Sequence, residues 1–132
     1  MGFQEIPHTA DCAILVWAPD FQSLLIEAAL GLNHISGVKL QEAGRTSRHL
    51  SLKAADAEGL LVAFLNELIF YQELENFGID RFELTIAPGG VEATLWGTPL
   101  MSRSRLVKAV TYHNLVIRSE SGRLRAEIVF DV

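Results

Sequence analysis

The stretch CAILVWA, at residues 12–18, consists of apolar residues in unbroken succession. Such a run is typical of a strand that is central in a sheet or covered on both faces. Pro19 and Asp20 follow at once, and beyond them apolar residues recur every three or four positions as far as Ile35. This spacing predicts a helix with one buried stripe, capped by Asp20 and ended by Gly37. A buried strand followed by a one-sided helix favours a fold in which helices pack on a sheet.

The rest of the chain shows the same two periods, three to four for a helix and two for a strand. A second helix is expected to be capped by Asp56, to bury a stripe at residues 60–69 and to end at Asn76 and Gly78. Phe70 falls opposite that stripe and is either covered by another element or exposed. The other expected segments are strands at residues 3–6 and 50–54, a polar loop at 39–48, strands at 82–86 and 91–95 joined by a turn at 88–90, an irregular loop at 97–105, and strands at 107–118 and 124–132 joined at Ser121 and Gly122.

These elements predict an α+β domain with two layers, in which a mixed or antiparallel sheet carries both helices on one face. A length of 132 residues fits one domain, residues 1–132. With 49% hydrophobic and 20% charged residues, the composition is that of a globular protein and excludes disorder for most of the chain. No apolar run is long enough to span a membrane, and the N-terminus lacks a secretory signal. Cys12, the only cysteine, excludes a disulfide framework within one chain, so we expect a cytoplasmic protein.

The charge of the chain is acidic overall and unevenly distributed. Sixteen acidic residues against 11 basic ones give a formal net charge of −5, so tight nucleic-acid binding by this domain alone is not expected. Acidic residues gather at residues 54–83 and basic ones from residue 101 onward. They form either two solvated faces of opposite sign or a docking surface that attracts a partner by its charge.

Three carboxylates are candidates for a metal site. Asp11 stands at the start of the buried strand, and Asp131 comes just before Val132, whose main-chain carboxylate ends the sequence. If the first long strand and the last strand are antiparallel neighbours, these groups converge. Oxygen ligands favour Ca²⁺, Mg²⁺ or Mn²⁺ over Zn²⁺. The alternative is that Asp131 and Val132 are solvated at a frayed end. His8 is either a ligand or a turn histidine bonded to the backbone.

Other side chains offer weaker signals. Lys108 is either an edge-strand charge or a cation directed at the carboxylates or at a partner. Asn66 and Glu67 lie off the apolar stripe of the second helix and either face solvent or meet a partner. Cys12 is expected to be a buried, inert thiol. Phosphate-binding, dinucleotide, serine-hydrolase and zinc-protease motifs are absent from the sequence, and no set of nucleophile, base and oxyanion donors assembles.

Four segments in this order resemble the archease family. They are HTADCAI at residues 8–14, DAEGLLVAFLNELIFY at 56–71, KAVTYHNLVI at 108–117 and AEIVFDV at 126–132. The departures are modest. Ala13 replaces a frequent glycine, Phe64 a frequent tryptophan, Asn114 a common acidic residue and Cys12 a usual aliphatic one.

The resemblance implies a protein cofactor rather than an enzyme. Archeases assist RtcB-type RNA ligases in tRNA splicing and RNA repair. These ligases use GTP and Mn²⁺, and archease promotes their guanylylation and multiple turnover. Family members bind a divalent cation, seen as calcium, through positions that correspond to Asp11, Asp131 and Val132. The family lysine corresponds to Lys108, which the resemblance implies to be a partner or activation residue, and His8 and Glu67 are further candidates for that role.

Two other functions remain open on the sequence. One is a chaperone or specificity factor for tRNA-modifying enzymes such as a tRNA methyltransferase, a role also proposed for archeases. The other is a small metal-dependent hydrolase built on the carboxylates, against which the lack of an additional base argues.

Overall fold

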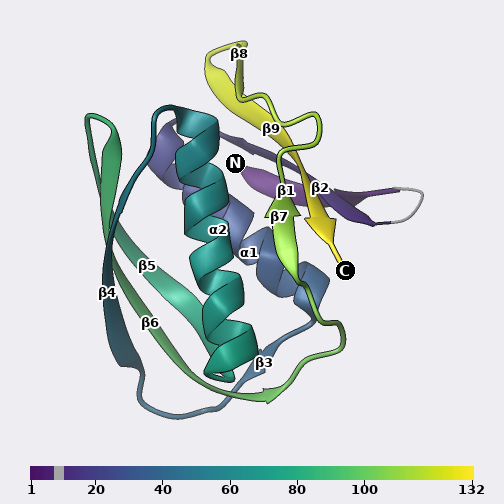
Figure 1. Cartoon of the computed structure of the whole chain (residues 1–132), viewed down its shortest axis with the longest axis vertical. Helices are drawn as coiled ribbons and strands as arrows, with labels where there is room; N and C mark the ends of the chain where they lie inside the picture. Colours follow the sequence, from purple (N-terminus) through teal and green to yellow (C-terminus); the bar gives the residue numbers. More distant parts are fainter. Residues whose placement is uncertain (8–10) are drawn as a thin grey trace.

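Two helices and two antiparallel sheets make up the computed structural model, which describes residues 1–7 and 11–132 (Figure 1). The helices are α1 (Phe21–Ser36) and α2 (Ala57–Leu74). The strands are β1 (Gly2–Ile6), β2 (Cys12–Ala18), β3 (Lys39–Leu40), β4 (Thr46–Lys53), β5 (Phe77–Ala87), β6 (Gly90–Ser102), β7 (Ala109–Thr111), β8 (Arg118–Glu120) and β9 (Arg123–Asp131). This arrangement confirms the predicted α+β class.

Each helix begins where the sequence predicts. The Asp20 carboxylate accepts a hydrogen bond from the Ser23 N–H at 2.7 Å, and the Asp56 carboxylate accepts one from the Gly59 N–H at 2.7 Å. These are N-cap bonds, which satisfy backbone donors that the first helical turn leaves free. Gly37 ends α1 with a φ of 61°, a left-handed conformation that glycine adopts without steric cost.

The strands form two sheets rather than the single sheet that the sequence suggested. One contains β1-β2-β9-β7, with β8 also paired to β9, and the other contains β3-β6-β4, with β5 paired to β6. Every pairing among the described strands is antiparallel. In the first sheet, β1 pairs with the free edge of β2, and β7 and β8 pair with the free edge of β9. In the second sheet, β4 and β5 lie on either side of β6. The described strands therefore pair only within their own sheet.

Four sequence-based boundaries were wrong. The segment expected to be a loop at residues 97–105 continues β6 as far as Ser102, and β3 and the start of β4 fall in the expected loop at 39–48. Gly78, expected to end α2, lies in β5. The expected strand at 107–118 divides into β7 and β8, because residues 112–117 leave β9 between them.

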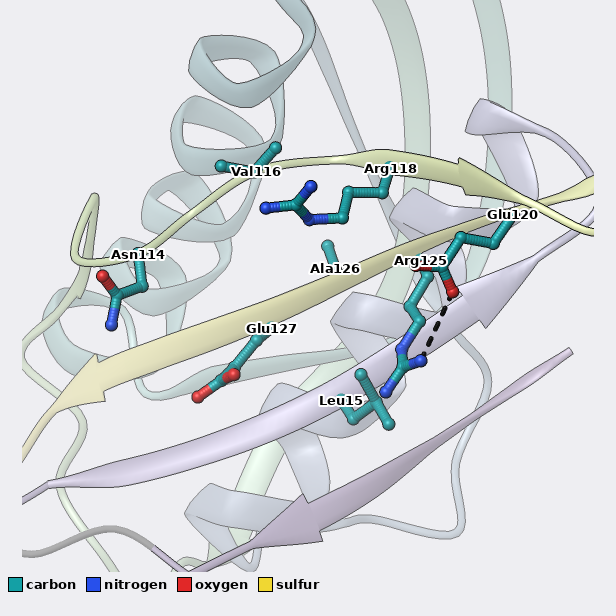
Figure 2. A pocket seen from close by; sticks show the side chains of 8 residues that line it. All are labelled: Leu15, Asn114, Val116, Arg118, Glu120, Arg125, Ala126 and Glu127. Carbon is teal, nitrogen blue, oxygen red and sulfur yellow. Dashed lines mark hydrogen bonds and ion pairs between the residues drawn. The ribbon is translucent and has the colours of Figure 1, made fainter.

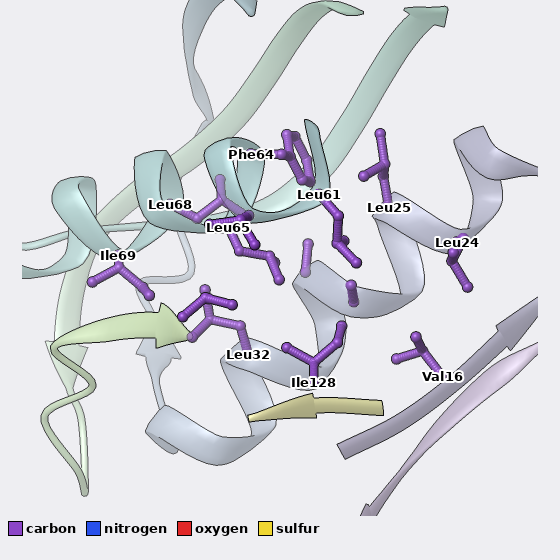
Figure 3. Packing of buried hydrophobic residues seen from close by; sticks show 14 of the residues in the cluster. Val16, Leu24, Leu25, Leu32, Leu61, Phe64, Leu65, Leu68, Ile69 and Ile128 are labelled. Carbon is purple, nitrogen blue, oxygen red and sulfur yellow. The ribbon is translucent and has the colours of Figure 1, made fainter. Parts of the chain in front are cut away.

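The core lies between the helices and the two sheets (Figure 3). Leu61, Phe64 and Leu65 of α2 are fully buried, as are Leu24 and Leu32 of α1. Each helix contacts strands of both sheets. Phe70 lies outside this core and is 47% exposed, which settles the alternative left open by its position on the helix. No helix in the described part of the chain is long and apolar enough to cross a membrane.

Candidate functional site

The pairing of β2 with β9 brings the first long strand beside the last. Cys12 lies opposite Phe130, and continuing this register by one residue sets Asp11 opposite Asp131. Phe130 is buried and Asp131 is exposed, so the Asp131 side chain points away from the core, as the alternation of the strand requires. The structure therefore brings the two predicted carboxylates to one corner of the sheet, beside Val132, which is 36% exposed.

Lys108 joins this corner through its main chain. Its backbone N–H donates a hydrogen bond of 2.8 Å to the backbone carbonyl of Asp131. Its side chain lies on the α2 side of the sheet, where it lines a groove together with Asn66 and Phe70. The lysine and the Asp131 carboxylate thus leave the end of the sheet in different directions, and both are placed by the same pairing of β7 with β9.

Two side chains of α2 hold the segment that carries Lys108. The Asn66 Oδ1 accepts a hydrogen bond of 3.0 Å from the Val110 N–H. The Glu58 Oε2 accepts one of 3.0 Å from the Ile117 N–H. These bonds connect residues far apart in the sequence, so no local pattern could have revealed them. Asn66 therefore has a structural role rather than facing solvent without a partner.

A second cation, which the sequence did not single out, lies beside Cys12, the residue that follows Asp11. The Arg105 Nη1 is 2.7 Å from the Cys12 Sγ. Arg105 is brought there because its backbone N–H and that of Ser104 both donate to the carbonyl of Ser36, at the end of α1. The prediction of a buried Cys12 among apolar neighbours was wrong, because the thiol is half-buried beside a guanidinium.

The other two candidates lie elsewhere. His8 is outside the described residues. Glu67 is half-buried on α2, where its charge acts on Tyr71. Burial raises the pKa of the Tyr71 hydroxyl, the carboxylates of Glu67 and Glu75 raise it further, and Arg48 lowers it. The structure therefore connects Glu67 with Tyr71 of its own helix rather than with the carboxylate corner.

The corner contains oxygen donors suited to a hard cation, but few of them. Among the described residues, no group of three or more His, Cys, Asp or Glu side chains could hold a metal ion. Asp11 and Asp131 supply two carboxylates, and the main chain of Val132 would have to supply the third donor. Because Ca²⁺ takes six to eight oxygen ligands, waters or a partner would complete the coordination of such an ion.

Comparisons with known proteins give a consistent result. The sequence profile of the Archease protein family (MTH1598/TM1083) matches residues 3–132. The protein archease of Methanopyrus kandleri is 33% identical over 144 residues, which cover 100% of both chains, and that of Methanosarcina mazei is 25% identical over 98% of this chain and 95% of its own.

Two solved structures share the fold. A crystal structure of an archease and possible chaperone from Thermotoga maritima superposes with a TM-score of 0.73 at 21% identity, covering 98% of this chain and 96% of its own. A solution structure from Methanobacterium thermoautotrophicum gives 0.71 at 23% identity and covers 99% of both chains.

Proposed function

Because the chain belongs to the archease family, we propose that it is a protein cofactor that activates an RtcB-type RNA ligase in tRNA splicing and RNA repair. In this role it promotes guanylylation of the ligase and allows multiple turnovers, and it works in the cytoplasm. The observation that most supports the proposal is the register of β2 and β9, which, extended by one residue, brings Asp11 and Asp131 to the same corner. The backbone N–H of Lys108 is hydrogen-bonded to Asp131 at this corner.

We further propose that Asp11, Asp131 and Val132 hold a divalent cation, in the first place Ca²⁺, with Mg²⁺ or Mn²⁺ as alternatives. Two carboxylates on adjacent strands repel each other, and a cation between them removes that repulsion. The ion would supply positive charge at the tip of the sheet. The exposed Asp131 leaves room for waters or for a group of the partner in the remaining coordination positions.

The residues of this corner would act by position and charge. The corner docks at the mouth of the ligase active site, and Lys108 presents its ammonium group to the nucleotide phosphates or to acidic groups around them. Nucleotidyl transfer depends chiefly on such positioning and on stabilisation of developing charge. Asn66 and Glu58 contribute indirectly, because they hold the segment on which Lys108 lies.

Single-turnover guanylylation of a cognate ligase tests this proposal. Asp11→Asn and Lys108→Ala are each expected to lower the stimulated rate by about tenfold or more, the range in which loss of one electrostatic contact to a transition state falls. Glu83→Gln and Lys53→Ala are the matched controls, because both residues are exposed on the other sheet. Full stimulation by both Asp11→Asn and Lys108→Ala would refute the proposed role.

A chaperone for tRNA-modifying enzymes is the second candidate. The Thermotoga maritima relative is described as a possible chaperone, and Phe70 and Leu74 expose apolar surface on α2. In a pull-down from cell extract, this function would recover a tRNA-modifying enzyme in excess of the ligase. Recovery of mainly the ligase would support the cofactor function.

A further inference from the structure

The sheet that contains β2 and β9 has one face that the helices do not cover. The residues of β2 and β9 that point toward the helices, such as Val16 and Ile128, belong to the core. The residues between them point the opposite way, and at the far end from Asp11 they are Leu15, Trp17 and Arg125. This outer face is therefore available for contact with another molecule.

Two adjoining grooves lie on the outer face. The larger, of about 460 Å³, runs between β9 and residues 114–118 and is lined by Arg118, Arg125 and Glu127 among others (Figure 2). The smaller, of about 300 Å³, is lined by Gln4, Leu15, Trp17, Arg123 and Arg125. Leu15 and Arg125 line both grooves, so the two form one continuous surface.

The arginines of this surface are only partly neutralised. Arg118 on β8 lies directly opposite Arg125 on β9, and like charges so placed destabilise a strand pair. Glu120 accepts from Arg125 at 3.4 Å (Figure 2). In the described part of the chain, Arg118 and Arg123 have no ion pair or hydrogen bond from their guanidinium groups. Glu120 and Glu127 therefore set two carboxylates against three guanidinium groups on this surface, and an anion bound between the strands would relieve the repulsion of the arginines.

An aromatic ring lies next to these charges. Trp17 is opposite Arg125 in the register of β2 and β9, and it is opposite Gly2 in the register of β1 and β2. The indole lies over Gly2, where an added Cβ atom would come within 3.0 Å of a ring carbon. The absence of a side chain at Gly2 thus lets the indole pack down on the sheet. We call Trp17, Arg118, Arg123 and Arg125 the arginine face.

We propose that the arginine face binds single-stranded nucleic acid. Its phosphates would lie between Arg118 and Arg125, and a base would stack near Trp17. Guanidinium groups beside an aromatic ring on an open sheet are the means by which proteins hold unpaired strands, because every base has a flat face and every nucleotide carries a charge. An acidic peptide would satisfy the arginines but would not use the indole. This binding does not depend on activation of a ligase.

The acidic character of the whole chain sets the expected strength of binding. With a net charge of −5, and with Glu127 in the groove, the interaction is weak and sensitive to salt. It therefore agrees with the expectation that the domain does not bind nucleic acid tightly.

Fluorescence anisotropy with a labelled oligouridylate of about ten nucleotides, at about 50 mM salt, tests the proposal. The double variant Arg118→Gln/Arg125→Gln is expected to weaken binding by about tenfold and to flatten the slope of log K against log salt by about 1.4. Trp17→Leu should weaken binding by about fivefold through lost stacking. Glu120→Gln should strengthen it by about twofold, because it removes a carboxylate that competes with phosphate.

Arg81→Gln is the matched control. Arg81 stacks on a tryptophan, Trp96, of the other sheet, so its loss should leave binding unchanged. Circular dichroism melts confirm that each variant is folded. The proposal is overturned if wild-type protein does not bind, if the double variant binds as wild type does, or if Arg81→Gln is equally damaging. Binding of a polyglutamate peptide more tightly than the oligonucleotide would also overturn it, by assigning the face to an acidic protein.

Discussion

Asp131 has two separate tasks in this structure. Its backbone carbonyl accepts the Lys108 N–H, which holds β7 in place, while its carboxylate is exposed at the end of β9, one residue beyond the last pair with β2. Replacing the carboxylate therefore changes the charge of the corner without removing the backbone bond. For this reason, substitutions of Asp131 and Asp11 can report on cation binding while the fold is kept.

Asp20 provides a pH-dependent contribution at the residue scale. The hydrogen bond from the Ser23 N–H, followed by one from the Ser23 side chain, lowers the pKa of Asp20 below its ordinary value of 3.8. A lowered pKa in the folded state stabilises the protein above pH 3.8, and this contribution is lost as the pH falls through the folded-state pKa. In thermal melts, the melting temperature of wild type should therefore be higher than that of Asp20→Asn at pH 7. The difference between the two melting temperatures should shrink below pH 4. A difference that does not vary with pH would contradict this account.

Helix caps could be predicted from the sequence, but the contacts of Asn66, Glu58 and Arg105 could not. A cap joins residues three positions apart, so its pattern is visible locally, as at Asp20 and Asp56. Asn66 and Val110 are 44 residues apart, and Arg105 and Cys12 are 93 apart. Such contacts exist only once the strands are ordered in space.

At the element scale, α2 and β7 form one unit through Asn66. Asn66→Ala removes the acceptor of the part-buried Val110 N–H, and it should lower the free energy of unfolding by about 1–2 kcal/mol. Hydrogen exchange at the Val110 amide should become faster. Glu67→Gln, the neighbouring residue on the same helix, is the control and should change neither measurement. Unchanged exchange at Val110 in Asn66→Ala would show that this bond does not hold β7.

The pairing of β6 with β5 at this point depends on a close approach of Gly97 and Gly78. A Cβ atom added at Gly97 would collide with the backbone carbonyl of Gly78 on β5. Gly97→Ala should therefore lower the free energy of unfolding by about 1–3 kcal/mol in denaturant titrations. Gly44→Ala is the control, because nothing lies within 4 Å of a Cβ atom there, and it should be close to neutral. Equal stability of the two variants would contradict the proposed close approach.

The same glycine explains why the sequence predicted a loop here. Gly97 and Pro99 are usually breakers of strands, and the local pattern favours an irregular segment. In the structure Gly97 instead permits close pairing, and the Leu100 N–H donates to the carbonyl of Asn76 across the hairpin. The residues that usually interrupt a strand are present here, but pairing with β5 keeps this segment in β6.

At the scale of the whole molecule, the outer face of one sheet has two ends of opposite charge. Asp11 and Asp131 lie at one end, and the arginine face lies at the other. The α+β class and the antiparallel pairing of the first long strand with the last could be predicted from the periods in the sequence. The second sheet and the arginine face could not, since they depend on how strands distant in sequence share their edges.

Calorimetric titration of the protein with Ca²⁺, and separately with Mn²⁺, tests the central claim most directly. The account predicts one site in the wild-type protein, weakened by about tenfold or more in both Asp11→Asn and Asp131→Asn, because each variant removes a charged ligand. Glu83→Gln should bind as wild type does. Absence of binding by wild type, or binding as tight as that of wild type in either aspartate variant, would contradict a cation shared between the two strands.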